Sequence, residues 1–338
     1  MKIITSRPAS FSELGQKANQ EDALWPSPHA VTANPRVLVL CDGMGGHAHG
    51  EVASRCVAHT VGELLAAVPP CPAVEMNRAL LAAVDAACDA LDRIDDSMPD
   101  DGPKMGTTLV VLAFCTDGVL AAHIGDSRIY QLRPGEGVVF QSRDHSLVND
   151  LIAAGELTPD EARSFPQKNV ITRALQPHQE FRAKPSVKLL TDVRPSDVFL
   201  LCCDGVTEQL TNNDLCRLLL QADMPLPERV DNVRKSCAEH NTRDNHTCWA
   251  VEVTAVGSER ADVTSDTSTH TGHRSRLKWL ILTVAVVAAC FAAGVALTRH
   301  GQKPSAPATP AVPEATAPTA DTAAPAQGTI HRPSNRTH

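Results

Sequence analysis

The chain has 338 residues, of which 43% are hydrophobic and 3% aromatic, and its formal net charge is −8. This length allows one large domain with additional segments, whereas the negative charge and the few aromatic side chains argue against a nucleic-acid-binding protein. The 11 cysteines are scattered, with no C-x-x-C pair. They therefore do not suggest a zinc ribbon or a disulfide framework, and they favour a reducing compartment for the main domain.

Short apolar runs and long amphipathic segments alternate along residues 2–256. The expected strands are Val37–Cys41, Thr108–Cys115, Leu120–His123, Ile129–Leu132, Val198–Cys202 and Thr247–Val253. The expected helices are Glu51–Val68, Ala73–Ile94, Ser146–Ala154, Asn213–Leu220 and Leu226–Glu239. Neighbouring short strands suggest antiparallel hairpins, and the long helices need a sheet to cover. We therefore predict a layered α+β domain over residues 1–256.

The composition changes after this domain. Residues 257–276 are rich in Ser, Thr and Asp and are expected to form a linker. Residues 277–298 carry one charge, Lys278, and a helix of about 22 residues is roughly 33 Å long, enough to cross a ~30 Å hydrocarbon core. We predict a transmembrane helix there, with a buried core helix as the alternative. Residues 299–338 are dominated by Pro, Ala and Thr, and we expect a disordered tail.

An acidic motif recurs beside glycines. The apolar run that begins at Val37 leads into Asp42, which Gly43 follows, and we interpret this as a buried strand, a tight turn and a helix. Asp204 similarly ends the run that begins at Val198, and Asp244 stands just before a predicted strand. Each acid alone also suits a turn or a helix cap. The repeated context is what favours a common site.

Two further acidic positions extend this pattern, namely the pair Glu21 and Asp22 and the single Asp126 between two apolar runs. If the strands lie side by side, the acids converge at one end of the sheet. Like charges packed together are costly unless a cation neutralises them. Carboxylates without His or Cys ligands suit Mg²⁺ or Mn²⁺ rather than zinc. Two such ions ~3.5–4 Å apart can activate a water and polarise a phosphoryl group.

Six motifs together resemble the metal-dependent protein phosphatases of the PP2C (PPM) family, in particular the bacterial Ser/Thr phosphatases. They are K-x-N-Q-E-D from Lys17, D-G-M-G-G-H from Asp42, M-G-T-T from Met105, G-D-S-R from Gly125, C-D-G-V-T-E from Cys203 and D-N-H-T from Asp244. The resemblance covers about Ser12 to Val253, and residues 144–175 resemble the family's flap beside the active site. It implies a four-layer αββα sandwich with the metals at one end, between the sheets.

The resemblance also assigns metal ligands. Asp42 corresponds to the acid that bridges two catalytic ions, and the carbonyl of Gly43 corresponds to a ligand of one of them. Asp204 and Asp244 match the ligands of the other ion. The implied cofactor is a pair of Mn²⁺ or Mg²⁺ ions.

The remaining acids complete the implied site. Glu21 matches the acid that holds a metal-bound water, and its neighbour Asp22 is expected to orient this shell. Asp126 matches the acid of a third metal site of bacterial members. The implied reaction is hydrolysis of phosphoserine or phosphothreonine by a metal-bridging hydroxide, without a phosphoenzyme.

Two positions depart from the family pattern. Lys17 stands where the family usually has an arginine that grips the substrate phosphate, and lysine supplies the charge without a bidentate fork. Met44 stands where eukaryotic members often carry a histidine as general acid, so protonation of the leaving group would fall to a metal-bound water. His47 and His49 are weaker candidates for this acid.

Three further patterns point to other chemistries. Residues 43–48 fail the dinucleotide-binding fingerprint because Ala48 occupies the last glycine position, and His47 with His49 lacks a third nitrogen or sulfur ligand for zinc nearby. The vicinal pair Cys202 and Cys203 suits either redox chemistry or two thiols on opposite faces of a strand.

Together these observations predict a membrane-anchored protein Ser/Thr phosphatase in the inner (cytoplasmic) membrane, with its catalytic domain in the cytoplasm. Its expected partners are phosphoserine and phosphothreonine proteins and a cognate Ser/Thr kinase. A catalytically weak scaffold that binds phosphoproteins is the main alternative, which the retained acids disfavour. Hydrolysis of a small phosphometabolite by the same metals is a third possibility.

Overall fold

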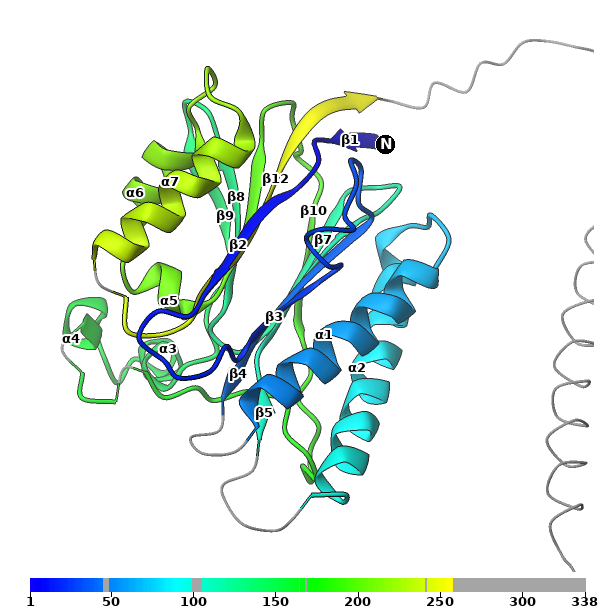
Figure 1. The fold of residues 1–338 in the computed structure, drawn as a ribbon, viewed down its shortest axis with the longest axis vertical. Coiled ribbons are helices and arrows are strands. Elements are labelled where there is room, and N and C mark those ends of the chain that lie inside the picture. The colour runs from blue at the N-terminus through cyan, green and yellow to red at the C-terminus, as the bar shows by residue number, and fades with distance from the viewer. Residues whose placement is uncertain (45–48, 99–104, 164, 168, 241, 258–338) are drawn as a thin grey trace, which may run out of the picture. The chain divides into compact units, whose positions relative to one another are not determined.

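The computed structural model describes residues 1–257, apart from 45–48, 99–104, 164, 168 and 241 (Figure 1). The expected linker beyond Gly257, the expected membrane span at 277–298 and the expected tail at 299–338 lie outside the described residues. Within the part of the chain that is described, no helix is both long and apolar enough to cross a membrane.

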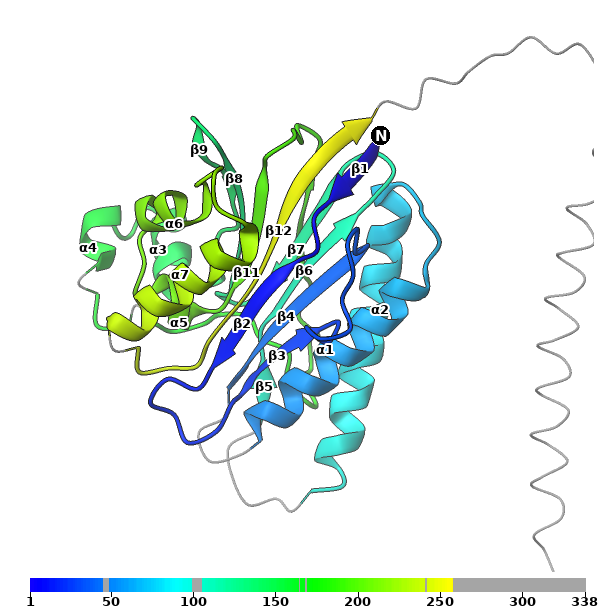
Figure 2. The same cartoon turned by 45° about the horizontal axis from the view of Figure 1, so that its top comes forward.

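Two antiparallel sheets form the centre of the domain (Figures 1 and 2). The first runs in the order β1-β12-β11-β8-β9, and β2 also pairs with β12. Its strands are β1 (Lys2–Thr5), β2 (Ala9–Glu13), β8 (Arg128–Arg133), β9 (Gly137–Gln141), β11 (Val198–Cys202) and β12 (His246–Gly257).

The second sheet runs in the order β10-β7-β6-β4-β3, and β5 also pairs with β4. Its strands are β3 (Asp22–Trp25), β4 (Val37–Met44), β5 (Gly106–Thr107), β6 (Leu109–Phe114), β7 (Val119–Ile124) and β10 (Ser186–Leu190). Every pairing in both sheets is antiparallel, as the short neighbouring runs predicted.

Helices cover the outer face of each sheet (Figure 1). The second sheet is covered by α1 (Gly50–Ala67) and α2 (Ala73–Asp95), and the first by α6 (Asn212–Leu219) and α7 (Leu226–Glu239). Three shorter helices are α3 (Leu147–Ala154), α4 (Pro159–Arg163) and α5 (Asp204–Thr207). The predicted α+β arrangement of two antiparallel sheets flanked by helices is confirmed.

The alternation of side chains along β4 places the first functional acid. Leu38 and Leu40 belong to the core between the two sheets, whereas Val39 and Cys41 pack in the core beneath α1 and α2. Because successive side chains of a strand point to opposite faces, Asp42 continues the row of Leu38 and Leu40. Its carboxylate therefore faces the space between the sheets.

Candidate active site

A pocket of about 420 Å³ gathers the acids that the sequence singled out. It is lined by Lys17, Ala18, Asn19, Glu21, Asp42, Gly43, Met44, Asp126, Ile171, Asp204 and Asp244. All predicted site residues except Asp22 are among them. Asp22 is 6% exposed and lies beside Asp42, so it belongs to the buried wall of the same site.

The sequence-based placement of these acids needs two corrections. Asp42 lies inside β4, which continues to Met44, and not in a turn after the strand. The strand before Asp204 also does not lie beside β4, because β11 belongs to the other sheet. The acids converge across the gap between two sheets rather than along the edge of one, and this matches what the family resemblance implied.

Asp22 and Asp42 are direct partners on the antiparallel strands β3 and β4. Side chains of such a pair lie on the same face, where two like charges are destabilising. Burial and then the neighbouring carboxylates raise the pKa of Asp42 well above its usual value, and burial raises the pKa of Asp22 to about 7. Neither carboxylate oxygen of Asp22 has a hydrogen-bond partner among the described residues. The pair therefore has the electrostatic character of a cation site.

Two threonines fix the backbone of Asp42. The Thr108 hydroxyl accepts a hydrogen bond from Asp42 N–H at 3.0 Å, and Thr108 N–H donates to the Asp42 carbonyl at 2.9 Å. The Thr107 hydroxyl donates to the same carbonyl at 2.9 Å. Thr108 also shares a 2.8 Å hydroxyl contact with Ser127. The M-G-T-T motif thus positions the acid at the centre of the site.

Gly43 lets the backbone of β4 lie against the backbone of Gly50 and Glu21, which a residue with a side chain would not allow. A Cβ at this position would lie 2.2 Å from the Gly50 carbonyl oxygen and 2.6 Å from that of Glu21. Gly43 N–H donates to the Glu21 carbonyl at 3.1 Å. The glycine therefore joins the K-x-N-Q-E-D segment to the start of α1 beside Asp42.

Asp204 and Asp244 come from the other sheet. Asp204 opens α5 two residues after the end of β11, and Asp244 lies two residues before β12, the antiparallel neighbour of β11. The end of one strand and the start of an antiparallel neighbour meet at the same edge, which brings both acids into the pocket. Burial, followed by the charge of Asp244, raises the pKa of Asp204 to about 6.

Lys17 pairs with two of these acids. Its Nζ lies 3.0 Å from Oδ1 of Asp244 and 3.8 Å from Oε2 of Glu21, and its side chain is 43% exposed. Burial alone would lower the pKa of Lys17, but the hydrogen bond to Asp244 and the surrounding carboxylates outweigh it and raise that pKa. A stable positive charge thus stands at the wall of the pocket.

Asp126 lies in the turn between β7 and β8 and is held by the start of the flap. Gly125 N–H donates to His145 Nδ1 at 3.1 Å, and His145 N–H donates back to the Gly125 carbonyl at 2.9 Å. Burial, then the charges of Asp204 and Asp144, raises the pKa of Asp126 to about 7. Its Oδ1 is buried without a hydrogen-bond partner among the described residues.

Asn245 is an organising residue that the sequence did not single out. Its side-chain oxygen accepts from Glu21 N–H at 2.8 Å, and its amide donates to the carbonyls of Leu14 and Asn19. Its N–H donates to Oδ1 of Asp244 at 2.8 Å. Asn245 was visible only as a member of the D-N-H-T motif, because the partners of its side chain are more than 220 residues away in sequence.

The candidates for a general acid differ in whether they line the pocket and whether they can donate a proton. Met44 lines the pocket, and its thioether has no proton to give. His49 is exposed and is absent from the residues lining this pocket, whereas His47 lies outside the described residues. No histidine lines the described pocket, so protonation of a leaving group by histidine finds no support there.

The donor set fits hard divalent cations. Carboxylate and backbone oxygens line the pocket, and buried oxygens of Asp22 and Asp126 have no hydrogen-bond partner within the described chain. Mg²⁺ and Mn²⁺ prefer such oxygen ligands, and buried acids of this density require positive charge. The residues therefore suit the metal ions that the resemblance implied.

Sequence comparisons agree with this geometry. A family profile described as protein phosphatase 2C matches residues 12–240. The serine/threonine protein phosphatase PstP of Mycobacterium tuberculosis is 36% identical over 220 residues, which span 64% of this chain and 39% of PstP. The protein phosphatase PhpP of Streptococcus pneumoniae is 30% identical over 250 residues, which span 74% of this chain and 98% of PhpP.

Solved structures share the fold. The crystal structure of M. tuberculosis PstP aligns with a TM-score of 0.64 at 32% identity and covers 75% of this chain and 100% of that one. The PstP catalytic domain in complex with two manganese ions aligns with a TM-score of 0.61 at 31% identity, with the same coverage. With its matching profile, fold and acidic pocket, this chain belongs to the protein phosphatase 2C family of metal-dependent Ser/Thr protein phosphatases.

Proposed function

We propose that the chain hydrolyses phosphoserine and phosphothreonine in proteins. The observation that carries the proposal is the convergence of carboxylates from both sheets in one pocket that also presents the cation of Lys17. The relatives support it, since PstP is a serine/threonine protein phosphatase and PhpP a protein phosphatase. The geometry does not favour the scaffold alternative, because every predicted acid is present in the pocket or its wall.

The site residues would divide the work as the resemblance implied. Asp42, the Gly43 carbonyl, Asp204 and Asp244 would hold two Mn²⁺ or Mg²⁺ ions, and PstP has been crystallised with two manganese ions. When bound, such ions supply an activated water and polarise a phosphoryl group. Asp126 would add a ligand for a third ion.

The other groups of the chain position these acids and the substrate. Glu21, through its backbone bonds to Gly43 and Asn245, stands next to Asp42 and can hold a water there. Buried Asp22, the cross-strand partner of Asp42, would help to orient the ligands around the metal ions. Lys17 would exchange its contact with Asp244 for a phosphate oxygen, which a single ammonium binds as a point charge.

The test is phosphate release from a phosphothreonine peptide by the full chain, with Mn²⁺ and with EDTA. We expect turnover that needs the metal and that Asp204→Asn abolishes. Asp231→Asn is the matched control and should retain turnover, because Asp231 is a partly exposed acid of α7 that pairs with Arg234 and Lys235 outside the pocket. A folded protein without turnover at any Mn²⁺ or Mg²⁺ concentration would favour the scaffold, and preference for sugar phosphates would favour a small-molecule phosphatase.

The proposal includes membrane anchoring through residues 277–298, with the catalytic domain on the cytoplasmic side of the inner membrane. The support is the long apolar run, its basic N-terminal flank at Arg274 and Arg276, and the many free thiols of the domain. Anchoring would place the enzyme near membrane-bound Ser/Thr kinases and their phosphorylated substrates.

A reporter that is active only outside the cytoplasm, fused after His300, tests this orientation. We expect activity of that reporter and recovery of the full chain in the membrane fraction. A second reporter, active only in the cytoplasm, is fused at the same position. A signal from this reporter alone would contradict the proposed orientation.

A further inference from the structure

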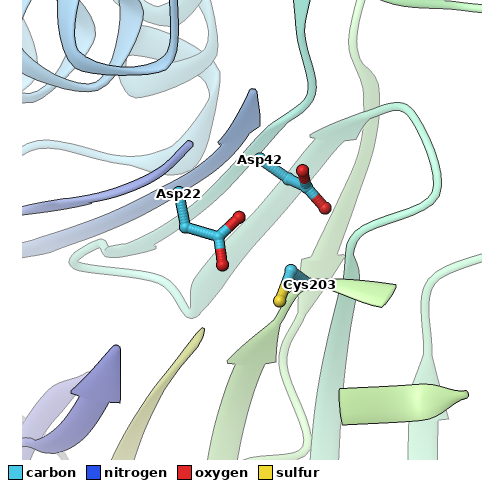
Figure 3. A group of neighbouring side chains, drawn as sticks. All are labelled: Asp22, Asp42 and Cys203. Atoms are coloured by element: carbon cyan, nitrogen blue, oxygen red, sulfur yellow. The ribbon is translucent and has the colours of Figure 1, made fainter. Parts of the chain in front are cut away.

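Cys203 brings a thiol into the acidic site. It is 0% exposed and follows the last residue of β11, immediately before Asp204. One carboxylate oxygen of Asp22, one of Asp42 and the sulfur of Cys203 all lie within 4.8 Å of one another. Figure 3 shows the three side chains gathered between the segments that carry them.

Burial and the nearby carboxylates raise the pKa of the Cys203 thiol well above its usual value, so the thiolate forms only with a cation bound beside it, as it does when a thiol coordinates a metal. Thr247 N–H donates to Cys203 Sγ at 3.1 Å, and a backbone N–H directed at sulfur stabilises negative charge there. The thiol itself lies 3.5 Å from the Asn245 carbonyl, a weak donor contact. The Asp22 carboxylate is 6% exposed, and its oxygens make no hydrogen bond of regular geometry among the described residues. The side chains of Thr247 and Cys203 lie near enough to offset only part of the cost of burying its charge.

Two carboxylates and a thiolate differ chemically from the rest of the pocket. Mn²⁺ and Mg²⁺ prefer oxygen ligands, whereas Zn²⁺ and related softer ions bind thiolate together with carboxylate. We propose that Asp22, Asp42 and Cys203 form a binding site for a thiophilic divalent cation, Zn²⁺ or Cd²⁺. Binding replaces the thiol proton, which passes to water, so three negative ligands hold one dication.

This site overlaps the proposed catalytic centre through Asp42. A carboxylate held by a zinc or cadmium ion at Cys203 cannot also bridge a manganese pair in the same way, so the softer ion should antagonise activation by Mn²⁺. This consequence rests on the proposed function. The binding site itself does not, and it can be tested without any phosphatase assay.

The experiment is a Cd²⁺ titration of the full chain, followed by the ultraviolet charge-transfer absorption of cadmium thiolate. Cys203→Ser should lose one thiolate's share of this absorption. Cys202→Ser is the matched control, because Cys202 is equally buried and alternation along the extended chain turns it to the opposite face. It should retain the absorption of Cys203, and excess Mn²⁺ should suppress that absorption in both the wild type and this control.

A second variant covers the case in which Cys203→Ser does not fold. Asp22→Asn keeps the thiol and relieves the repulsion between the paired acids, and we expect it to fold and to bind Cd²⁺ roughly tenfold or more weakly. Circular dichroism verifies the fold of each variant. Full cadmium–thiolate absorption in folded Cys203→Ser, none in the wild type, or unchanged affinity in Asp22→Asn would overturn the proposal.

Discussion

At the scale of single residues, Lys17 supplies the positive charge that the proposed function assigns to substrate binding. Removing a charge-assisted hydrogen bond costs about 1.5–3 kcal/mol, so Lys17→Ala should lower kcat/KM for a phosphopeptide roughly 10- to 100-fold, mostly through KM. Lys17→Arg should retain or improve KM, because its fork binds phosphate bidentately. Steady-state kinetics on both variants test this. An alanine variant as efficient as the wild type would show that Lys17 does not contribute to substrate binding.

The sequence located the site acids because each sits in a motif beside glycine or at the edge of an apolar run. It could not show that Asp22 and Asp42 are direct cross-strand partners, since this depends on the register of β3 against β4. It likewise could not bring Cys203 to them, because two sheets must first pack face to face. Contacts set by tertiary packing were the part that local patterns missed.

At the scale of elements, Thr107 of β5 and Thr108, the residue that joins β5 to β6, hold the end of β4. Thr108→Val removes the acceptor of Asp42 N–H and leaves that donor buried, which should cost about 1–3 kcal/mol of stability. Because the acid loses its orientation, we also expect Mn²⁺ affinity to fall roughly 10- to 100-fold. Thr108→Ser, which keeps the hydroxyl, should restore both quantities, and equal behaviour of Val and Ser would contradict the positioning role.

The same scale explains which elements the sequence predicted. The run Val198–Cys202, which is buried on both faces, forms a strand with the predicted bounds, and the amphipathic helix at Leu226–Glu239 also coincides. The other five predicted strands form, but their ends differ from the predicted bounds by one residue or more. The strands that were missed include β1, β3, β9 and β10, which lie at the ends of the sheet orders. These edge strands are short, partly exposed and interrupted by polar residues. They therefore lack the continuous apolar runs by which the buried strands were predicted.

At the scale of the whole molecule, the sandwich concentrates buried acids between its sheets, and this makes stability depend on pH. The pKa values of Asp22 and Asp126 are raised from 3.8 to about 7, and that of Asp204 to about 6, chiefly by burial. The folded state thus binds these protons more tightly than the unfolded chain does. In EDTA, the free energy of unfolding should fall as the pH rises from about 4 to about 7.

Thermal unfolding at pH 5 and at pH 8 measures this effect. We expect a lower Tm at pH 8 in EDTA, and we expect saturating Mn²⁺ to reverse the loss by neutralising the carboxylates. Asp22→Asn removes one of the titrating groups and should reduce the pH dependence. An equal or higher Tm at pH 8 in EDTA would contradict the electrostatic account.

The most direct test of the central claim is the number of Mn²⁺ ions that the full chain binds, counted by titration with the paramagnetic resonance of free Mn²⁺. We predict two tightly bound ions, the number of manganese ions in the PstP catalytic-domain complex, and the loss of both in folded Asp42→Asn, because the proposed function assigns this acid to both ions. Asp231→Asn should bind as the wild type does. No tight Mn²⁺ binding by the wild type, or undiminished binding by Asp42→Asn, would contradict a metal-dependent phosphatase site built around Asp42.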